Sequence, residues 1–130
     1  MAGGARAFIT GVTGQDGAYL ARFLLDKGYD VHGLVRWDSY ADQDDGIRRL
    51  VSLGIKETDI TLHAGDMIDA QCITALIKKI KPSEIYNLAA LSQVGVSFQT
   101  PVSALDINTK GTRALLEAVR LLDMVGRVRL

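Results

Sequence analysis

The sequence predicts an α/β fold with a doubly wound parallel sheet. Short apolar segments typical of buried strands alternate strictly with segments whose apolar residues recur at helical spacing. Strands that are apolar on both faces indicate a parallel sheet covered by helices on both sides. Because 48% of the 130 residues are hydrophobic, the chain can bury the core of one domain.

The strands are expected where short apolar runs stand between turn-forming residues. Four strands and the start of a fifth are expected, at residues 7–10, 31–35, 60–63, 84–89 and 127–130. Because the chain stops within the fifth strand, we expect a truncated piece of a longer fold. Residues 1–5 show no periodicity, so a disordered N-terminus is expected there, followed by one domain over residues 6–130.

Three helices are expected between these strands, each with its own end signal. The first ends at Gly28 and the second at Gly54, because glycine readily adopts the conformation that follows a helix. Asp69 can cap the third helix, which runs to about Lys81 and cannot continue through Pro82.

A long fourth helix is expected to begin at Pro101, a residue suited to the first helical turn. We interpret Asn108, on its buried face, as a structural polar bridge and not as a catalyst. The residues that share this face are Leu105, Asn108, Thr112, Leu115, Leu116 and Val119.

Composition narrows the function classes. Lysine plus arginine equals aspartate plus glutamate at 15 each, so no global charge attracts nucleic acid or an anionic membrane. No signal peptide is visible, and no apolar stretch approaches the roughly 20 residues that span a bilayer.

We expect a cytoplasmic protein in which Cys72 is a buried, unreactive thiol. His32 and His63 lie on expected strands, so no metal site is expected.

A glycine turn stands between the first expected strand and the first helix. Gly11, Gly14 and Gly17 form a GxxGxxG pattern, at the place where a helix N-terminus can meet a pyrophosphate. The first glycine permits a tight turn, the second lets the backbone approach phosphate, and the third lets the helix pack closely on the sheet. A structural turn also uses glycines, but the alternation of strands and helices around this one favours a dinucleotide site.

Thr13, Gln15 and Asp16 complete the predicted phosphate turn. Gln15 can supply neutral hydrogen bonds near the cofactor. A carboxylate in the first helical turn gains from the helix dipole but repels a pyrophosphate, so Asp16 should point away from the phosphates. The sequence leaves open whether Asp16 supports the turn or contacts the cofactor.

The chain resembles the GDP-mannose 4,6-dehydratases, a nucleotide-sugar branch of the extended short-chain dehydrogenases. The motif that carries the resemblance is threonine before GxxGxxG, with Gly-Gln-Asp-Gly at its end, over residues 10–17. Similarity continues through residues 28–36, 65–67, 84–90 and 115–118, so it covers nearly the whole chain. The resemblance implies a Rossmann fold that binds a nicotinamide dinucleotide.

The residue after the second strand bears on the choice of cofactor. The planar guanidinium of Arg36 matches a 2′-phosphate, so we favour NADP over NAD, as the resemblance also implies. The alternative is a solvated arginine beside a loop. The family usually continues with a second arginine and serines, where this chain has Trp37, Asp38 and Ser39. Trp37 is interpreted either as a stacking partner of adenine or Arg36 or as an interface or core aromatic.

Further cofactor contacts are expected after the third and fourth strands. Asp66 and Met67 match the adenine-binding pair of the family, although a helix cap is the competing role for Asp66. Leu88, Ala89 and Ala90 are expected cofactor residues at the end of the fourth strand. The small side chains of Ala89 and Ala90 would leave room for ribose and nicotinamide at the sheet edge, and ordinary packing is the alternative.

Residues 91–97 match a family segment near the nicotinamide and the sugar. Ser92 is the candidate there for a hydrogen bond to cofactor or substrate, and an ordinary loop serine is the alternative. The family usually has glutamine at the position of Leu91 and histidine at that of Gln93, so the exact sugar stays open.

The resemblance implies conversion of GDP-mannose to GDP-4-keto-6-deoxymannose. Hydride leaves C4 of the mannose, water is eliminated across C5 and C6, and the hydride returns to C6. The catalytic Tyr-x-x-x-Lys pair of the family would follow the fifth strand. We therefore expect a cofactor-binding part with no catalytic residue, inactive alone. None of the four tyrosines is followed by lysine four positions later: Tyr19, Tyr29, Tyr40 and Tyr86.

Two alternatives stay open. One is another nucleotide-sugar dehydratase, epimerase or reductase, suggested by Leu91, Gln93 and Trp37. The other is a non-catalytic dinucleotide-binding regulator. Because family members are commonly dimers or tetramers, a homodimer or homotetramer is expected for the full-length enzyme. Residues 38–46 would then lie near a neighbouring cofactor or form a solvated acidic loop.

Overall fold

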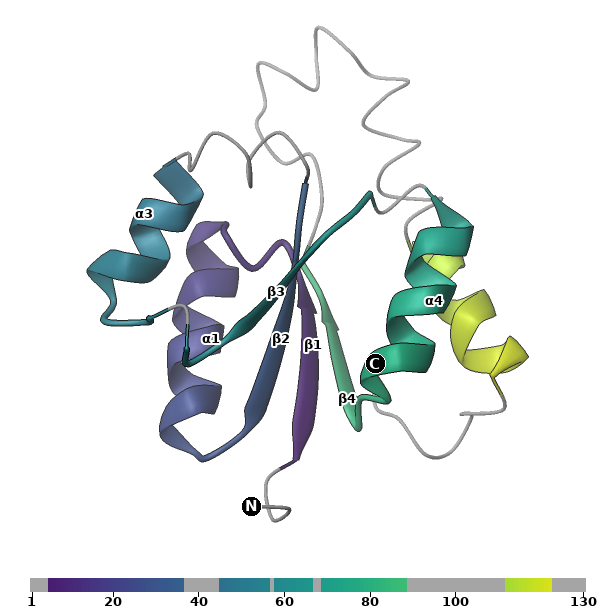
Figure 1. The fold of residues 1–130 in the computed structure, drawn as a ribbon, viewed down its shortest axis with the longest axis horizontal. Helices are drawn as coiled ribbons and strands as arrows, with labels where there is room; N and C mark the ends of the chain where they lie inside the picture. The colour runs from purple at the N-terminus through teal and green to yellow at the C-terminus, as the bar shows by residue number, and fades with distance from the viewer. Residues whose placement is uncertain (1–4, 37–44, 57, 67–68, 89–111, 123–130) are drawn as a thin grey trace, which may run out of the picture.

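The computed structural model describes residues 5–36, 45–56, 58–66, 69–88 and 112–122. A parallel sheet of four strands forms its centre, in the order β3-β2-β1-β4 (Figure 1). The order steps outward from β1 in both directions, which is the doubly wound arrangement. The predicted fold class is therefore confirmed. The strands are β1 (Arg6–Thr10), β2 (Asp30–Val35), β3 (Thr61–Ala64) and β4 (Glu84–Asn87).

The strands lie close to their expected positions, with one clear difference. β4 was expected to run through residue 89, but it ends at Asn87, and Leu88 is no longer in the strand. The expected fifth strand at residues 127–130 and the start of the helix expected at Pro101 lie outside the described residues.

Helices cover both faces of the sheet. α1 (Gln15–Asp26) and α3 (Asp45–Ser52) lie on one face, and α4 (Ala70–Ile80) and a helix over residues 112–121 lie on the other (Figure 1). None of the helices in the described residues is long and apolar enough to cross a membrane.

The helix ends follow the local signals in the sequence. Gly28 and Gly54 have φ angles of 85° and 75°, a left-handed conformation that suits glycine after a helix. Asp69 caps α4, because its carboxylate accepts the N–H groups of Gln71 and Cys72 at 3.1 and 3.2 Å.

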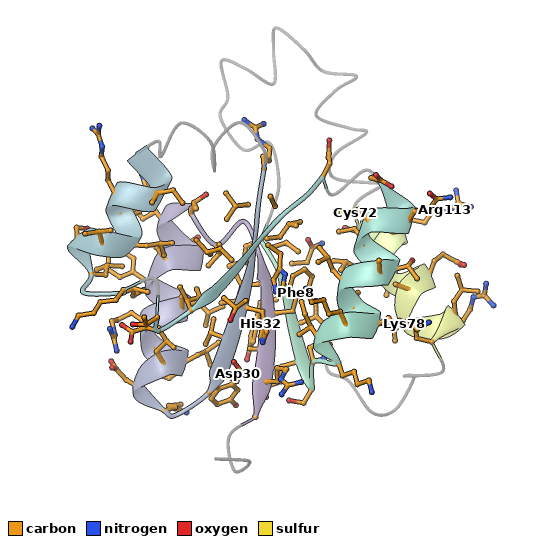
Figure 2. The ribbon with its side chains drawn as sticks, viewed as in Figure 1. Phe8, Asp30, His32, Cys72, Lys78 and Arg113 are labelled. Atoms are coloured by element: carbon orange, nitrogen blue, oxygen red, sulfur yellow. The ribbon has the colours of Figure 1, made fainter. Side chains whose placement is uncertain are left out.

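The core is divided by the sheet into two apolar clusters. Alternate residues of β1 point to opposite faces, so Ala7 and Ile9 pack with α1 and α3, whereas Phe8 packs with α4 (Figure 2). All three side chains are fully buried. This double burial explains why β1 is apolar without alternation.

Two details of the helices differ from simple expectation. Tyr19 and Phe23, part of the apolar pattern that predicted α1, are 57% and 54% exposed, while Leu24 is buried. Cys72 is half-buried, so the expectation of a buried thiol was wrong. A Cβ on Gly65 would lie 2.6 Å from the sulfur of Cys72, so the residue that follows β3 passes close to the first turn of α4.

Candidate functional site

The glycine turn joins the carboxyl end of β1 to the amino end of α1. Gly11 has a φ angle of 70°, so the chain reverses through a conformation that other residues rarely adopt. The N–H of Gly14 donates to the carbonyl of Gly11 at 3.0 Å and closes the turn. The turn therefore has the tight geometry that the sequence predicted.

Gly17 is required by the turn itself. A Cβ at this position would overlap the carbonyl oxygen of Gly11 and would lie 2.8 Å from Cα of Val12. Both neighbours are backbone atoms, so no side chain can move aside. The prediction attributed this glycine to packing on the sheet, but its closest contacts are with the preceding turn.

A second close approach was not found from the sequence. A Cβ on Gly33, in β2, would lie 2.6 Å from Cγ1 of Val12. The valine, fully buried, therefore fits over β2 only because that strand has no side chain there. The signal was a glycine inside an apolar strand, which often marks a close contact.

The first turn of α1 has main-chain donors that the helix itself does not pair. Its first intrahelical bond runs from the N–H of Ala18 to the carbonyl of Gly14 at 2.9 Å. By helix geometry, the N–H groups of Gln15, Asp16 and Gly17 have no acceptor within the helix. Gly14, at the N-cap, has no side chain to cap them. Such a helix terminus can hold an anion such as a pyrophosphate.

A chain of side-chain hydrogen bonds ties the ends of β1 and β4 together beside the turn. The hydroxyl of Thr10, fully buried, donates to Oδ1 of Asn87 at 2.8 Å. Nδ2 of Asn87 donates to the hydroxyl of Thr112 at 3.0 Å. Thr112 was expected on a buried helix face, and the structure gives it this polar partner. The bonds hold the turn, β4 and the helix over residues 112–121 in one arrangement.

Arg36 and Asp66 follow the carboxyl ends of β2 and β3. Both are exposed, and the N–H of Gly65 bonds to the carbonyl of Val35 at 2.9 Å, so these two strand ends are adjacent. Because the strands are parallel, both residues lie at the same edge of the sheet as the glycine turn. The helix-cap role considered for Asp66 belongs to Asp69 instead.

Arg49, on α3, is a functional candidate that the sequence did not reveal. Its Nη1 donates to the carbonyl oxygen of Thr13 at 2.5 Å, and its side chain is half-buried. The two residues are 36 positions apart, so no local pattern links them.

A separate polar cluster lies on the sheet face toward α4 (Figure 2). His32 Nδ1 and His63 Nε2 are 3.0 Å apart, and His32 Nε2 lies 3.2 Å from the carboxylate of Asp30, which also accepts from Arg6 at 2.8 Å. The polar groups of this cluster are therefore hydrogen-bond partners of one another. No set of three side chains suited to a metal occurs within the described parts of the chain.

This cluster shifts two pKa values. Burial lowers the pKa of His63 below 6.5, and the charges of His32 and Lys79 lower it further. Burial alone would raise the pKa of Asp30, but hydrogen bonds and attraction from His32 and Arg6 bring it below 3.8.

Comparison with known proteins relates this geometry to a family. A family model described as GDP-mannose 4,6 dehydratase matches residues 8–130. The chain belongs to the GDP-mannose 4,6-dehydratase family. It is 50% identical over 123 residues to a GDP-mannose 4,6-dehydratase of Sordaria araneosa, covering 95% of this chain and 21% of that protein. It is 42% identical over 125 residues to the GDP-mannose 4,6 dehydratase of Homo sapiens, covering 95% and 33%.

The chain thus spans between a fifth and a third of the length of these curated relatives. Among solved structures, it is similar to a UDP-glucose-4-epimerase from Stenotrophomonas maltophila with bound NAD and formylated UDP-arabinopyranose. The TM-score is 0.73 at 24% sequence identity, over 89% of this chain and 33% of that one. This likeness shows the fold, which is part of a Rossmann-type fold.

For this member of the GDP-mannose 4,6-dehydratase family, the structure describes most of the predicted site. Eight of the thirteen predicted cofactor residues lie on the glycine turn, in the first turn of α1 or just after strand ends, all at one edge of the sheet, and Leu88 follows β4 directly, with an exposed side chain. The orientation proposed for the Asp16 carboxylate stays a prediction. The eight predicted cofactor residues at this edge of the sheet are Gly11, Thr13, Gly14, Gln15, Asp16, Gly17, Arg36 and Asp66. Met67, Ala89, Ala90 and Ser92 lie outside the described residues, as do Trp37, Asp38 and Asn108.

Proposed function

We propose that the chain forms the NADP-binding part of an enzyme that converts GDP-mannose to GDP-4-keto-6-deoxymannose. The observation that carries the proposal is the start of α1, whose main-chain donors lie at the same sheet edge as Arg36 and Asp66. Family membership supports the reaction, since the curated relatives are named as GDP-mannose 4,6-dehydratases. The solved epimerase with bound NAD supports the class of cofactor.

The residues of the turn fit a dinucleotide. The three N–H groups at the start of α1 would hold the pyrophosphate, and the absence of a side chain at Gly14 leaves room for it to approach. Arg36 would hold the 2′-phosphate through a charge-assisted, bidentate contact. The full proposed set is Gly11, Thr13, Gly14, Gln15, Asp16, Gly17, Arg36, Asp66, Met67, Leu88, Ala89, Ala90 and Ser92.

Bound NADP would supply the acceptor and later the donor of the hydride. The part described here binds and orients that cofactor, and it contributes no acid or base to the reaction. The catalytic tyrosine and lysine implied by the resemblance would belong to a part of the enzyme other than these 130 residues, so we propose that the chain alone is inactive. The complete enzyme is proposed to be a cytoplasmic homodimer or homotetramer with residues 6–130 as one domain.

The test is mass spectrometry of GDP-mannose incubated with the full-length protein and catalytic NADP. We expect a product lighter by one water with NADP and much less with NAD. Unchanged GDP-mannose from folded, cofactor-loaded protein would overturn the substrate assignment, and other nucleotide sugars would then be assayed. Failure to bind either dinucleotide would overturn the cofactor site as well.

The role of Arg36 is tested by Arg36→Met. The dissociation constant for NADP should rise by about tenfold or more, because a charge-assisted hydrogen bond is lost, while that for NAD stays nearly constant. Arg120→Met removes the same charge from an exposed residue of the helix over residues 112–121 and serves as the control. Equal weakening of NADP and NAD by Arg36→Met would contradict the assignment.

A further inference from the structure

Arg49 connects the helix between β2 and β3 to the glycine turn. The residue lies on α3, which packs on the same face of the sheet as α1 (Figure 1). Its guanidinium reaches the turn and donates to the carbonyl of Thr13. Arg48, the preceding residue, is exposed, whereas Arg49 is half-buried.

The contact restrains one particular peptide unit. The carbonyl of Thr13 and the N–H of Gly14 belong to the same planar group, and they point in opposite directions. The N–H is held by the carbonyl of Gly11 at 3.0 Å, and the carbonyl is held by Arg49. Because both sides of the plane are bonded, the peptide cannot rotate without breaking a hydrogen bond.

The restrained peptide immediately precedes the donors of the proposed pyrophosphate site. The N–H groups of Gln15, Asp16 and Gly17 follow it along the chain, so their directions depend on its orientation. A glycine at the N-cap gives no side-chain support, and glycine is the residue with the greatest backbone freedom. The bond to Gly11 restrains one side of this peptide from within the turn, and the bond from Arg49 on α3 restrains the other side.

The positive charge of Arg49 also favours binding of an anion at the start of α1. A guanidinium stays protonated and carries five N–H groups, so one bond to a carbonyl uses only part of its capacity. Its positive charge lies beside a helix terminus that already favours anions. The carboxylate of Asp16, in the first turn of α1, opposes anion binding, and a nearby cation offsets this repulsion.

We propose that Arg49 is a positioning residue for the cofactor: it fixes the Thr13–Gly14 peptide so that the first N–H groups of α1 face the pyrophosphate. This inference rests on the proposed dinucleotide-binding function. It adds a residue outside the glycine motif to the determinants of cofactor affinity.

The first test is calorimetric titration of the full-length protein with NADP. Arg49→Met should weaken binding by about tenfold or more, because a charge-assisted hydrogen bond to the turn is lost. Arg49→Lys keeps the charge and one donor, so it should recover part of the affinity. Arg48→Met, the matched control on the same helix, removes the same charge and should stay within about twofold of the native value. Native affinity in Arg49→Met, or an equal loss in Arg48→Met, would overturn the proposal.

The second test is amide hydrogen exchange in the protein without cofactor, which does not depend on binding. The N–H of Gly14 should exchange about tenfold faster or more in Arg49→Met, because the peptide loses its second restraint, and it should be unchanged in Arg48→Met. Equal exchange in the native protein and Arg49→Met would overturn the proposal even if cofactor affinity fell. If the native protein binds no dinucleotide, the proposed function fails, while this measurement still decides whether Arg49 holds the turn. Arg49→Lys provides the same comparison if Arg49→Met does not fold.

Discussion

The N-termini of α1 and α4 differ in whether a side chain caps their main-chain N–H groups. Both helices begin after the carboxyl end of a strand, and both have main-chain N–H groups without helical acceptors. At α4, the carboxylate of Asp69 accepts two of these groups. At α1, Gly14 occupies the same position and offers no side chain. The N-terminus of α4 is therefore closed by a capping side chain, and that of α1 is open because it has none.

This difference shows how a fold separates stability from binding. A capping side chain contributes about 1 kcal/mol to helix stability, which α1 forgoes. The open donors of α1 can then be satisfied by an anionic ligand, and such a ligand stabilises the folded protein when it binds. A carboxylate at the start of α4 would repel a phosphate, so α4 is not suited to the same role.

The largest effect is expected from Gly17→Ala, which disrupts the packing of the α1 N-terminus against the glycine turn. The added Cβ would overlap the backbone of Gly11 and crowd that of Val12, so α1 would have to move from the turn. We expect a loss of about 3 kcal/mol in the free energy of unfolding, measured in urea, together with loss of dinucleotide binding. Gly14→Ala is the control for stability alone, because a Cβ there meets its nearest atom, the Gly11 carbonyl oxygen, at 3.3 Å. Its added methyl group would enter the space proposed for the pyrophosphate, so dinucleotide binding should fall in this variant as well. Native stability of Gly17→Ala would show that the turn can adapt.

An intermediate effect is expected from Asp69→Ala, which opens the closed terminus. The free energy of unfolding should fall by about 1 kcal/mol, because the N–H groups of Gln71 and Cys72 lose their acceptor. Asp69→Ser retains a capping oxygen and should keep most of the stability. Dinucleotide affinity should change little in either variant, and a loss as large as that of Arg49→Met would mean that the two termini are not functionally distinct.

The smallest effect is expected from pH, through a cluster that does not touch the open terminus. Because the pKa of His63 is lowered in the folded protein, the unfolded chain binds the proton more readily. The contribution of His63 to stability is therefore full above its unfolded pKa of 6.5 and is lost as pH falls through the lower folded value. The pKa of Asp30 is below 3.8, so the contribution of this carboxylate to stability is lost only in stronger acid.

The measurement is urea unfolding of the native protein and His63→Gln between about pH 7.5 and 5.5. The native protein should lose stability more steeply than the variant on the acid side. Parallel curves would show that His63 does not govern this range. Dinucleotide affinity should lack this dependence on His63, since the cluster makes no contact with Gly14 or Gln15 among the described interactions.

The sequence by itself determined the features that contiguous residues encode. Apolar runs on both faces predicted a parallel sheet, and Gly28, Gly54 and Asp69 predicted helix ends, because each signal acts within a few positions of the chain. The glycine turn was likewise recognisable, since Gly11 and Gly17 stand at the spacing that a tight strand-to-helix connection requires.

Only the tertiary structure decided which distant residues support that turn. Arg49 donates to Thr13, which is 36 positions away in the sequence, and Val12 fits over Gly33 because of the alignment of β1 with β2. Likewise, the spacing of Phe23 predicted a helix but not that this side chain would face solvent. These relations depend on the register of the strands and on the packing of crossover helices, and neither is encoded in any short segment of the chain.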